Sequence, residues 1–158
     1  IAGYAVDNQT VLLGVDYRYN IKDRIRLAPS VLYALKSGEN KMDTWYVNAD
    51  AHYLARLTER FTMYPIGGLG LSMWAWDVPA FGTENPENPE ETEETEEIPT
   101  PTVKTSRETK MRVGLNIGIG CENRVTDEIV IGVEFKYNLT TERIYNQAML
   151  SARVAYYF

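Results

Sequence analysis

Apolar and polar residues alternate with a period of two along most of this chain. The stretch from 148 to 158 shows the pattern most clearly. One of its faces consists of Ala148, Leu150, Ala152, Val154, Tyr156 and Phe158, and the other of Met149, Ser151, Arg153, Ala155 and Tyr157. Because successive side chains of a β-strand point to opposite faces, this alternation predicts a strand with one apolar face and one face that carries charge.

The same alternation predicts seven further strands, at 1–7, 10–20, 25–36, 44–57, 61–76, 111–121 and 129–138. Short turns are expected at 22–24, 58–60 and 126–128, and longer connections at 37–40, 77–108 and 140–146. Pro29 falls within the third strand and lacks the N–H that a ladder needs, so we expect a local bulge there.

The longest interruption of the alternation, residues 77–108, is rich in Glu, Pro and Thr. It contains nine Glu, and its only basic residues are Lys104 and Arg107. The formal net charge of −6 for the whole chain therefore comes from this stretch. Because it has few apolar side chains to bury, we expect a mobile loop that the fold does not need.

Acids and bases occur together on the face opposite the apolar one. A soluble barrel would turn its apolar faces inward, whereas a membrane barrel turns them toward lipid. The second arrangement is favoured, because every strand has an aliphatic face while the other faces carry charges and glycines. The residues predicted to form a polar network in the lumen are Asp16, Arg18, Arg26, Asp50, His52, Arg56, Arg112, Asn116, Glu122, Glu134, Lys136 and Arg153.

Aromatic residues gather toward the ends of the predicted strands, on the apolar face. Such residues form belts where a barrel crosses the two membrane interfaces. The predicted periplasmic belt is Tyr17, Tyr19, Tyr53, Phe61, Tyr156 and Phe158, and the predicted outer belt is Tyr33, Trp45, Phe135 and Tyr137.

Eight alternating strands, with the last one ending on Phe158, resemble the small bacterial outer-membrane barrels of the opacity type and the outer-membrane-protein-A type. The resemblance implies an all-β, eight-stranded, antiparallel up-and-down transmembrane barrel formed by one domain, 1–158. Short turns would be periplasmic, and 77–108 would be an extracellular acidic loop. It also implies a place in the outer membrane of a Gram-negative bacterium, after removal of a secretion signal ahead of Ile1.

The resemblance implies partners as well. These are outer-membrane lipids, with lipopolysaccharide in the outer leaflet, the barrel assembly machinery that reads the terminal aromatic strand, and other outer-membrane proteins in a complex. No nucleic acid is expected as a partner.

Little in the sequence points to catalysis. His52 and Asp50 share a strand face and could form a general base with its orienting carboxylate, but no nucleophile pairs with them. The glycines of 67–70 precede no helix, so they do not form a phosphate loop. Cys121 is the only cysteine and cannot form an internal disulfide. We expect no catalytic residue, no cofactor and no metal site.

The interior of an eight-stranded barrel is just filled by side chains, so its charges must pair. On neighbouring strands, Glu134 is expected to lie opposite or diagonal to Ser151 or Arg153, within reach of the guanidinium group of Arg153. The predicted function is therefore that of a plugged scaffold with a structural, adhesive or accessory-subunit role. The alternatives are a narrow porin-like channel and, less favoured, a lipid-modifying barrel enzyme.

Overall fold

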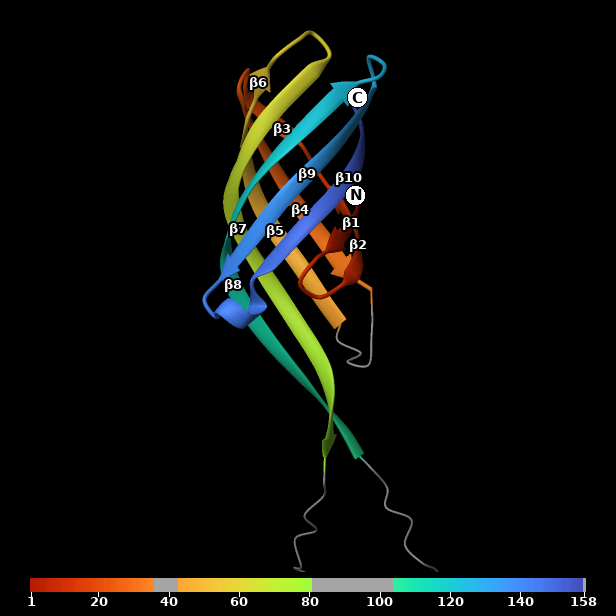
Figure 1. The fold of residues 1–158 in the computed structure, drawn as a ribbon, viewed down its shortest axis with the longest axis vertical. Helices are drawn as coiled ribbons and strands as arrows, with labels where there is room; N and C mark the ends of the chain where they lie inside the picture. The colour runs from red at the N-terminus through yellow and green to blue at the C-terminus, as the bar shows by residue number, and fades with distance from the viewer. Residues whose placement is uncertain (36–42, 81–103, 158) are drawn as a thin grey trace, which may run out of the picture.

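The protein is a tall barrel of antiparallel strands with one hairpin that extends far beyond the others (Figure 1). The computed structural model describes residues 1–35, 43–80 and 104–157. The elements are β1 (Ala2–Ala5), β2 (Thr10–Asp16), β3 (Tyr19–Lys22), β4 (Ile25–Ala34), β5 (Asp43–Tyr53), β6 (Ala55–Arg56), β7 (Phe61–Ala80), β8 (Lys104–Arg124), β9 (Ile129–Thr140), the 3₁₀ turn η1 (Arg143–Tyr145) and β10 (Gln147–Tyr156).

The sheet closes on itself. The described strands pair in the order β2-β1-β10-β9-β8-β7-β5-β4-β3, and the pairing of β2 with β4 joins the two ends. β2 and β3 follow one another along β4, and β5 and β6 follow one another along β7. The ten described strands therefore occupy eight strand positions around the barrel, and each position is called a stave here. The predicted eight-stranded antiparallel barrel is confirmed.

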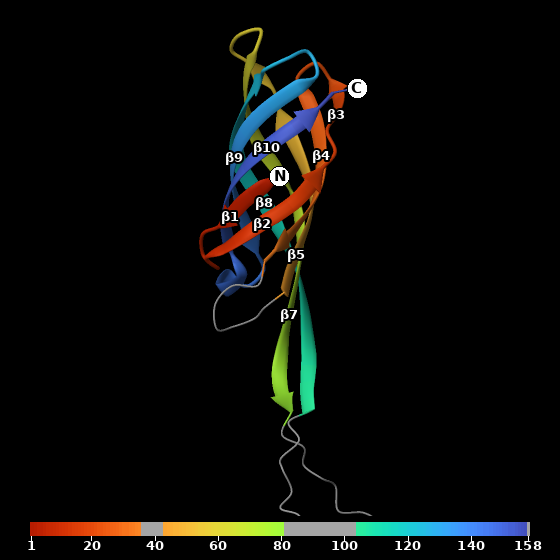
Figure 2. The ribbon, with the colours of Figure 1, turned by 90° about the vertical axis from the view of Figure 1, so that its right-hand side faces the viewer.

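The barrel has two unlike ends, which Figures 1 and 2 show at the top and bottom of the view. At one end, named here the turn end, short turns link β3 to β4, β6 to β7 and β8 to β9. At the other, the loop end, lie η1, the last residues of β4 and the first residues of β5. The predicted alternation of short and long connections matches this arrangement.

The burial pattern is inside out relative to a soluble protein. Val15 and Val154 are 73% and 74% exposed on the outer face, whereas Arg26 and Glu134 are 0% and 1% exposed inside the barrel. An outer wall of aliphatic residues is stable only where water is absent, as in the hydrocarbon core of a bilayer. In the described part of the chain, no helix is long and apolar enough to cross a membrane.

The predicted bulge at Pro29 was wrong. Pro29 pairs with Ala49 in an uninterrupted register. The proline affects the pairing of β4 with β2 instead. The N–H of Tyr17 donates to the carbonyl of Pro29, but Pro29 has no N–H to donate in return. β2 accordingly ends at Asp16. The register shift in this stave lies between Asn20 and Lys22.

The strands on either side of the acidic stretch are longer than expected. β7 and β8 stay paired from Phe61–Asn123 to Ala80–Lys104, so residues 77–80 and 104–108 are strand and not loop. β5 pairs with β7 only as far as Ala75, and β9 pairs with β8 only from Gly114. The two strands therefore leave the barrel as a two-stranded ribbon. The rest of the predicted loop, 81–103, lies outside the described residues.

The predicted belt residues within the described chain point outward, whereas Phe158 lies outside it. Tyr33 and Trp45 are neighbours at the loop end, with ring centroids 4.7 Å apart. Phe135 and Tyr137 face Ile119 and Ile117 instead, well inside the β8–β9 pairing. The assignment of two complete belts stays a prediction.

Ile119 offers a test of the lipid-facing wall, since it lies outward at the middle of the β8 segment that pairs with β9. Ile119→Arg should lower the free energy of unfolding by ~2–4 kcal/mol, because a charge at the bilayer midplane is costly. Val125→Arg, in the exposed turn after β8, is the matched control and should cost about 0–1 kcal/mol. Denaturant titration of the barrel in lipid vesicles measures both; equal losses would contradict the assigned depth.

Candidate functional site

The inside of the barrel holds a cluster of charged side chains that we name the plug. Its members are Asp16, Arg18, Arg26, Asp50, Glu122, Glu134, Lys136 and Arg153. Each side chain is 10% exposed or less. Four are basic and four acidic, so the plug is formally neutral. Its residues come from β2, β4, β5, β8, β9, β10 and the break before β3, so the ion pairs tie the staves together across the lumen.

Arg18 contacts more carboxylates than any other base of the plug. Its Nε donates to Asp16 Oδ2 at 2.7 Å and its Nη1 to Glu122 Oε2 at 2.7 Å, while Nη2 lies 3.4 Å from Glu134 Oε1. Arg18 stands in the break between β2 and β3 that Pro29 causes. A planar guanidinium can serve three acceptors in this way, which an ammonium group does less well.

Two other arginines complete this part of the plug. Arg26 donates to both oxygens of Glu122 at 3.0 Å, a bidentate pair. Arg153 reaches Asp16 Oδ2 at 2.8 Å and Glu134 Oε2 at 2.5 Å. Ser151 lies opposite Glu134 in the register, so the expected diagonal contact between Arg153 and Glu134 is present.

A second layer of the plug lies farther toward the loop end. Lys136 donates to Asp50 Oδ2 at 2.7 Å, and Asn116 Nδ2 donates to Asp50 Oδ1 at 2.7 Å. Asn138 in turn donates to Asn116 Oδ1 at 2.6 Å. Gly70 makes room for these amides, because a Cβ there would lie 2.6 Å from Asn138 Nδ2. Gly68 and Gly70 thus serve packing inside the lumen, whereas a Cβ at Gly67 would meet nothing within 4 Å.

Beyond this layer, apolar side chains close the lumen at the loop end. Trp74 lies between Tyr46 and Tyr145, with ring centroids 6.2 and 5.3 Å away. Leu12, Leu32 and Met149 belong to the same buried cluster. The lumen is thus filled by charges toward the turn end and by apolar side chains toward the loop end.

Two of the arginines predicted for the network lie outside the plug. Arg112 is at the loop end, where it pairs with Glu142 at 2.9 Å and lies over the ring of Tyr145. Arg56 is exposed, because the inward positions of its stave end with Leu54, and its Nη2 donates to the carbonyl of Asp23. The expectation that Arg56 joins a buried network was wrong.

His52 and Asp50 do not form a catalytic pair. The imidazole of His52 stacks on the ring of Tyr64 with centroids 4.7 Å apart, while Asp50 accepts from Lys136 and Asn116. Among the described residues, no group of His, Cys, Asp and Glu side chains could hold a metal ion. Cys121 is a free thiol, half-buried in the wall.

Sequence reasoning did not assign Tyr64 and Asn138 to the network, although their positions on the inward face were readable from the alternation. The hydroxyl of Tyr64 donates to Glu134 Oε1 at 2.9 Å, and Arg26 lies over its ring at 4.8 Å. Gly120 provides the space for this ring. Parity could have placed both residues inside, but no pattern within their own strands indicates which charges they meet.

Comparison with protein families decides the family. The model of the outer membrane protein beta-barrel domain matches residues 2–158. The chain belongs to this family of outer-membrane β-barrels. The protein is therefore a bacterial outer-membrane protein that crosses the membrane with strands, as its exposed aliphatic wall requires.

Solved structures of other outer-membrane barrels share the fold. Neisserial surface protein A matches with a TM-score of 0.65 at 16% identity, and the match covers 99% of this chain and 92% of that one. The N-terminal barrel of Pseudomonas aeruginosa OprF gives 0.62 at 16% identity over 99% and 92%. Ail of Yersinia pestis gives 0.56 at 16% identity over 94% and 80%. No curated protein sequence gave a significant match.

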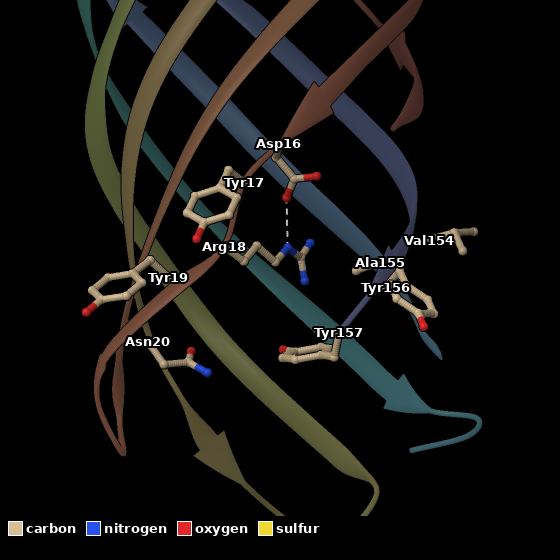
Figure 3. A pocket seen from close by; sticks show the side chains of 9 residues that line it. All are labelled: Asp16, Tyr17, Arg18, Tyr19, Asn20, Val154, Ala155, Tyr156 and Tyr157. Carbon is tan, nitrogen blue, oxygen red and sulfur yellow. Dashed lines mark hydrogen bonds and ion pairs between the residues drawn. The ribbon is translucent and has the colours of Figure 1, made fainter. Parts of the chain in front are cut away.

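Next to the plug, this outer-membrane barrel has a side cavity of about 340 Å³. It lies between the β2–β3 stave and the end of β10, beyond the last residues of either that pair with β1 (Figure 3). Tyr17, Tyr19 and Tyr156 surround its mouth, and the Arg18–Asp16 pair lies at its base. The cavity therefore lies directly beside Arg18, the base of the plug that contacts the most carboxylates.

The Lys136–Asp50 pair gives a clean test of the plug, because Lys136 contacts a single carboxylate. Lys136→Met should destabilise the barrel by about 3–5 kcal/mol, since Asp50 would keep a buried charge without a counter-charge. Adding Asp50→Asn should recover part of that loss. Lys22→Met, at an exposed position, is the control and should cost little. Additive single and double variants in denaturant titrations would show that the two groups do not depend on each other.

Proposed function

We propose that the protein is a non-catalytic scaffold of the outer membrane, closed by its plug, that presents a hairpin at the cell surface in a structural, adhesive or accessory-subunit role. The observation that carries the proposal is the plug itself. Its ion pairs bridge strands across the lumen, and an apolar layer lies between them and the loop end. The interior thus supports mechanical closure better than transport.

A porin-like channel is less well supported. An aqueous lumen would leave its charges solvated, whereas the charged groups here are buried and contact one another. Opening a path through them would separate pairs such as Arg26–Glu122 and Lys136–Asp50. Separating buried pairs is costly, since each ion left behind lacks its counter-charge.

A barrel enzyme is also less well supported. In the described chain, the His–Asp combination that could supply a general base is divided between two different contacts, an aromatic stack and an ion pair. General-base catalysis needs a base within hydrogen-bond reach of a reacting group, and His52 is buried against Tyr64.

The surface role rests on the ribbon of β7 and β8, which projects past the loop end. Loops and projecting hairpins on rigid barrels are where binding residues concentrate. Two structural neighbours fit a surface role by their own descriptions: one is Neisserial surface protein A, and the other is the attachment invasion locus protein, also solved with the heparin analogue sucrose octasulfate.

The partners proposed for this barrel follow from its surfaces. Its aliphatic wall suits membrane lipid, with lipopolysaccharide in the outer leaflet, and the last strand suits recognition by the barrel assembly machinery. The projecting ribbon suits contact with another cell-surface or outer-membrane protein.

Planar-bilayer recording tests whether the lumen is closed. The purified protein should insert without a stable conductance of porin size, because the plug fills the lumen. A variant with Arg18→Ala, Glu122→Ala and Trp74→Ala should show small conductance steps, since side chains of both the charged and the apolar filling of the lumen are shortened. A stable porin-sized conductance of the unmodified barrel would overturn the closed-scaffold proposal.

Replacement of residues 81–103 by a short Gly-Ser turn tests folding of the barrel and attachment of cells separately. The shortened protein should still run faster unheated than boiled on a gel, because the described strands close the sheet among themselves. Cells that carry it should lose the attachment conferred by the full-length protein. A shortened protein that never inserts would reveal a structural role for residues 81–103, whereas unchanged attachment would show that these residues do not carry the proposed function.

A further inference from the structure

A second cavity, of about 580 Å³, opens at the turn end of the barrel. It is bounded by the turn between β6 and β7, by the end of β8 and by the end of β10, and three arginines line it: Arg56, Arg60 and Arg124. All three are exposed, unlike the arginines of the plug. They belong to the mouth of the lumen, not to its filling.

Two of these arginines face each other directly. The β7–β8 register pairs Phe61 with Asn123, and one step beyond it the N–H of Arg124 donates to the carbonyl of Arg60 at 2.8 Å. Opposite residues of an antiparallel pair have Cβ atoms about 4.5–5.5 Å apart, and like charges placed so are destabilising. Arg56 pairs with Thr62 on the same stave of β7 and adds a third positive charge nearby.

The carboxylates near these arginines do not neutralise them. Glu122 borders the cavity, but Arg18 and Arg26 occupy both of its oxygens. Glu59 also lines the cavity, yet no ion pair joins it to Arg56, Arg60 or Arg124 among the described residues. With Glu122 engaged in the plug, three guanidinium groups share the space with one carboxylate.

The cavity is also connected to the plug. Arg124 lies over the ring of Tyr157 at 5.9 Å, and the hydroxyl of Tyr157 lies 3.4 Å from Arg26 Nη1. The aromatic ring thus holds Arg124 over the opening, where its guanidinium group can meet a ligand. Thr62 and Thr58 add hydroxyl groups to the lining.

We infer that this cavity is a binding site for a small oxyanion, a phosphate or a carboxylate, held by Arg60 and Arg124 with Arg56 beside them. Guanidinium groups donate paired N–H bonds in a planar fork that matches the oxygens of these anions. An anion between the two facing arginines would replace their mutual repulsion with two charge-assisted contacts. The short turn that carries Arg60 fixes the geometry, because Thr58 Oγ1 accepts from the N–H groups of Arg60 and Phe61.

Inorganic phosphate is the probe for the test. The purified barrel in zwitterionic detergent is titrated with phosphate at constant ionic strength set by chloride, and the arginine Nε–H resonances are followed by NMR. Saturable shifts are expected at Arg60 and Arg124. Arg60→Gln and Arg124→Gln should each raise the dissociation constant about tenfold, since each removes one charge-assisted contact.

Arg24→Gln is the matched control. Arg24 is also exposed at the turn end, but it lies outside the cavity and contacts the hydroxyl of Tyr53. This variant should bind phosphate as the unmodified protein does. An equal loss of phosphate affinity in Arg24→Gln and Arg60→Gln would show that general surface charge causes the binding, and would overturn the proposed site. The absence of a saturable shift at Arg60 and Arg124 would also overturn it.

Stability gives an independent reading that does not depend on activity. Without phosphate, Arg60→Gln should raise the temperature at which the gel band converts to the unfolded form, because it removes a like-charge contact. With phosphate, this conversion temperature should rise for the unmodified protein and stay unchanged for the variant, since a ligand stabilises only the state that binds it. A stabilising effect of phosphate that is equal in both proteins would contradict the proposed contacts.

The phosphate group could come from a dissolved anion or from a lipid headgroup. Nanodiscs of phosphatidylglycerol and nanodiscs of phosphatidylcholine distinguish the two sources. Arginine shifts that appear in phosphatidylglycerol without added phosphate would assign the site to anionic lipid. Shifts that need added phosphate in both lipids would assign it to a soluble anion.

Discussion

The structure depends on charge neutrality inside a closed wall. A barrel in lipid satisfies every backbone group only by closing, and closing traps the inward side chains of eight staves in a narrow lumen. In this protein eight of those side chains form the charged plug, and each of the eight must meet an opposite charge. Arg18 and Glu122 are 104 positions apart in the sequence and 2.7 Å apart in space. Closure of the sheet and pairing of the charges therefore require each other.

The two filled layers of the lumen divide the work of closure. The charged layer fixes which strands lie across from which, because an ion pair with the wrong partner leaves a buried charge. The apolar layer around Trp74 and Tyr46 fills volume without any such demand. Glycines at 70 and 120 adjust the space for the layers they face, giving way to an amide in one case and a phenol ring in the other.

Alternation allowed the faces of the strands to be predicted, because a period of two needs no knowledge of neighbours. It placed Arg26, Glu134 and Arg153 inside and Val15 and Val154 outside. It could not show that Arg26 meets Glu122, since contacts across the lumen depend on how the strands are staggered around the barrel. It also placed Arg56 inside, although the buried positions before it end at Leu54. It predicted a bulge at Pro29 itself, whereas the proline interrupts the pairing with the neighbouring strand β2. The contact of Arg153 with Glu134 was accessible because it joins two strands that follow one another in the sequence and pair directly.

The ribbon of β7 and β8 has a mechanical consequence. Its two strands emerge from the barrel side by side, and five residues, 76–80, lie beyond the last β5 pairing. This makes a stalk of about 17 Å at ordinary strand rise. A pull on the stretch between its ends would act along both strands at once. The tension would enter the wall as shear along β5 and β9, where many hydrogen bonds share the load, instead of opening the ladder one rung at a time.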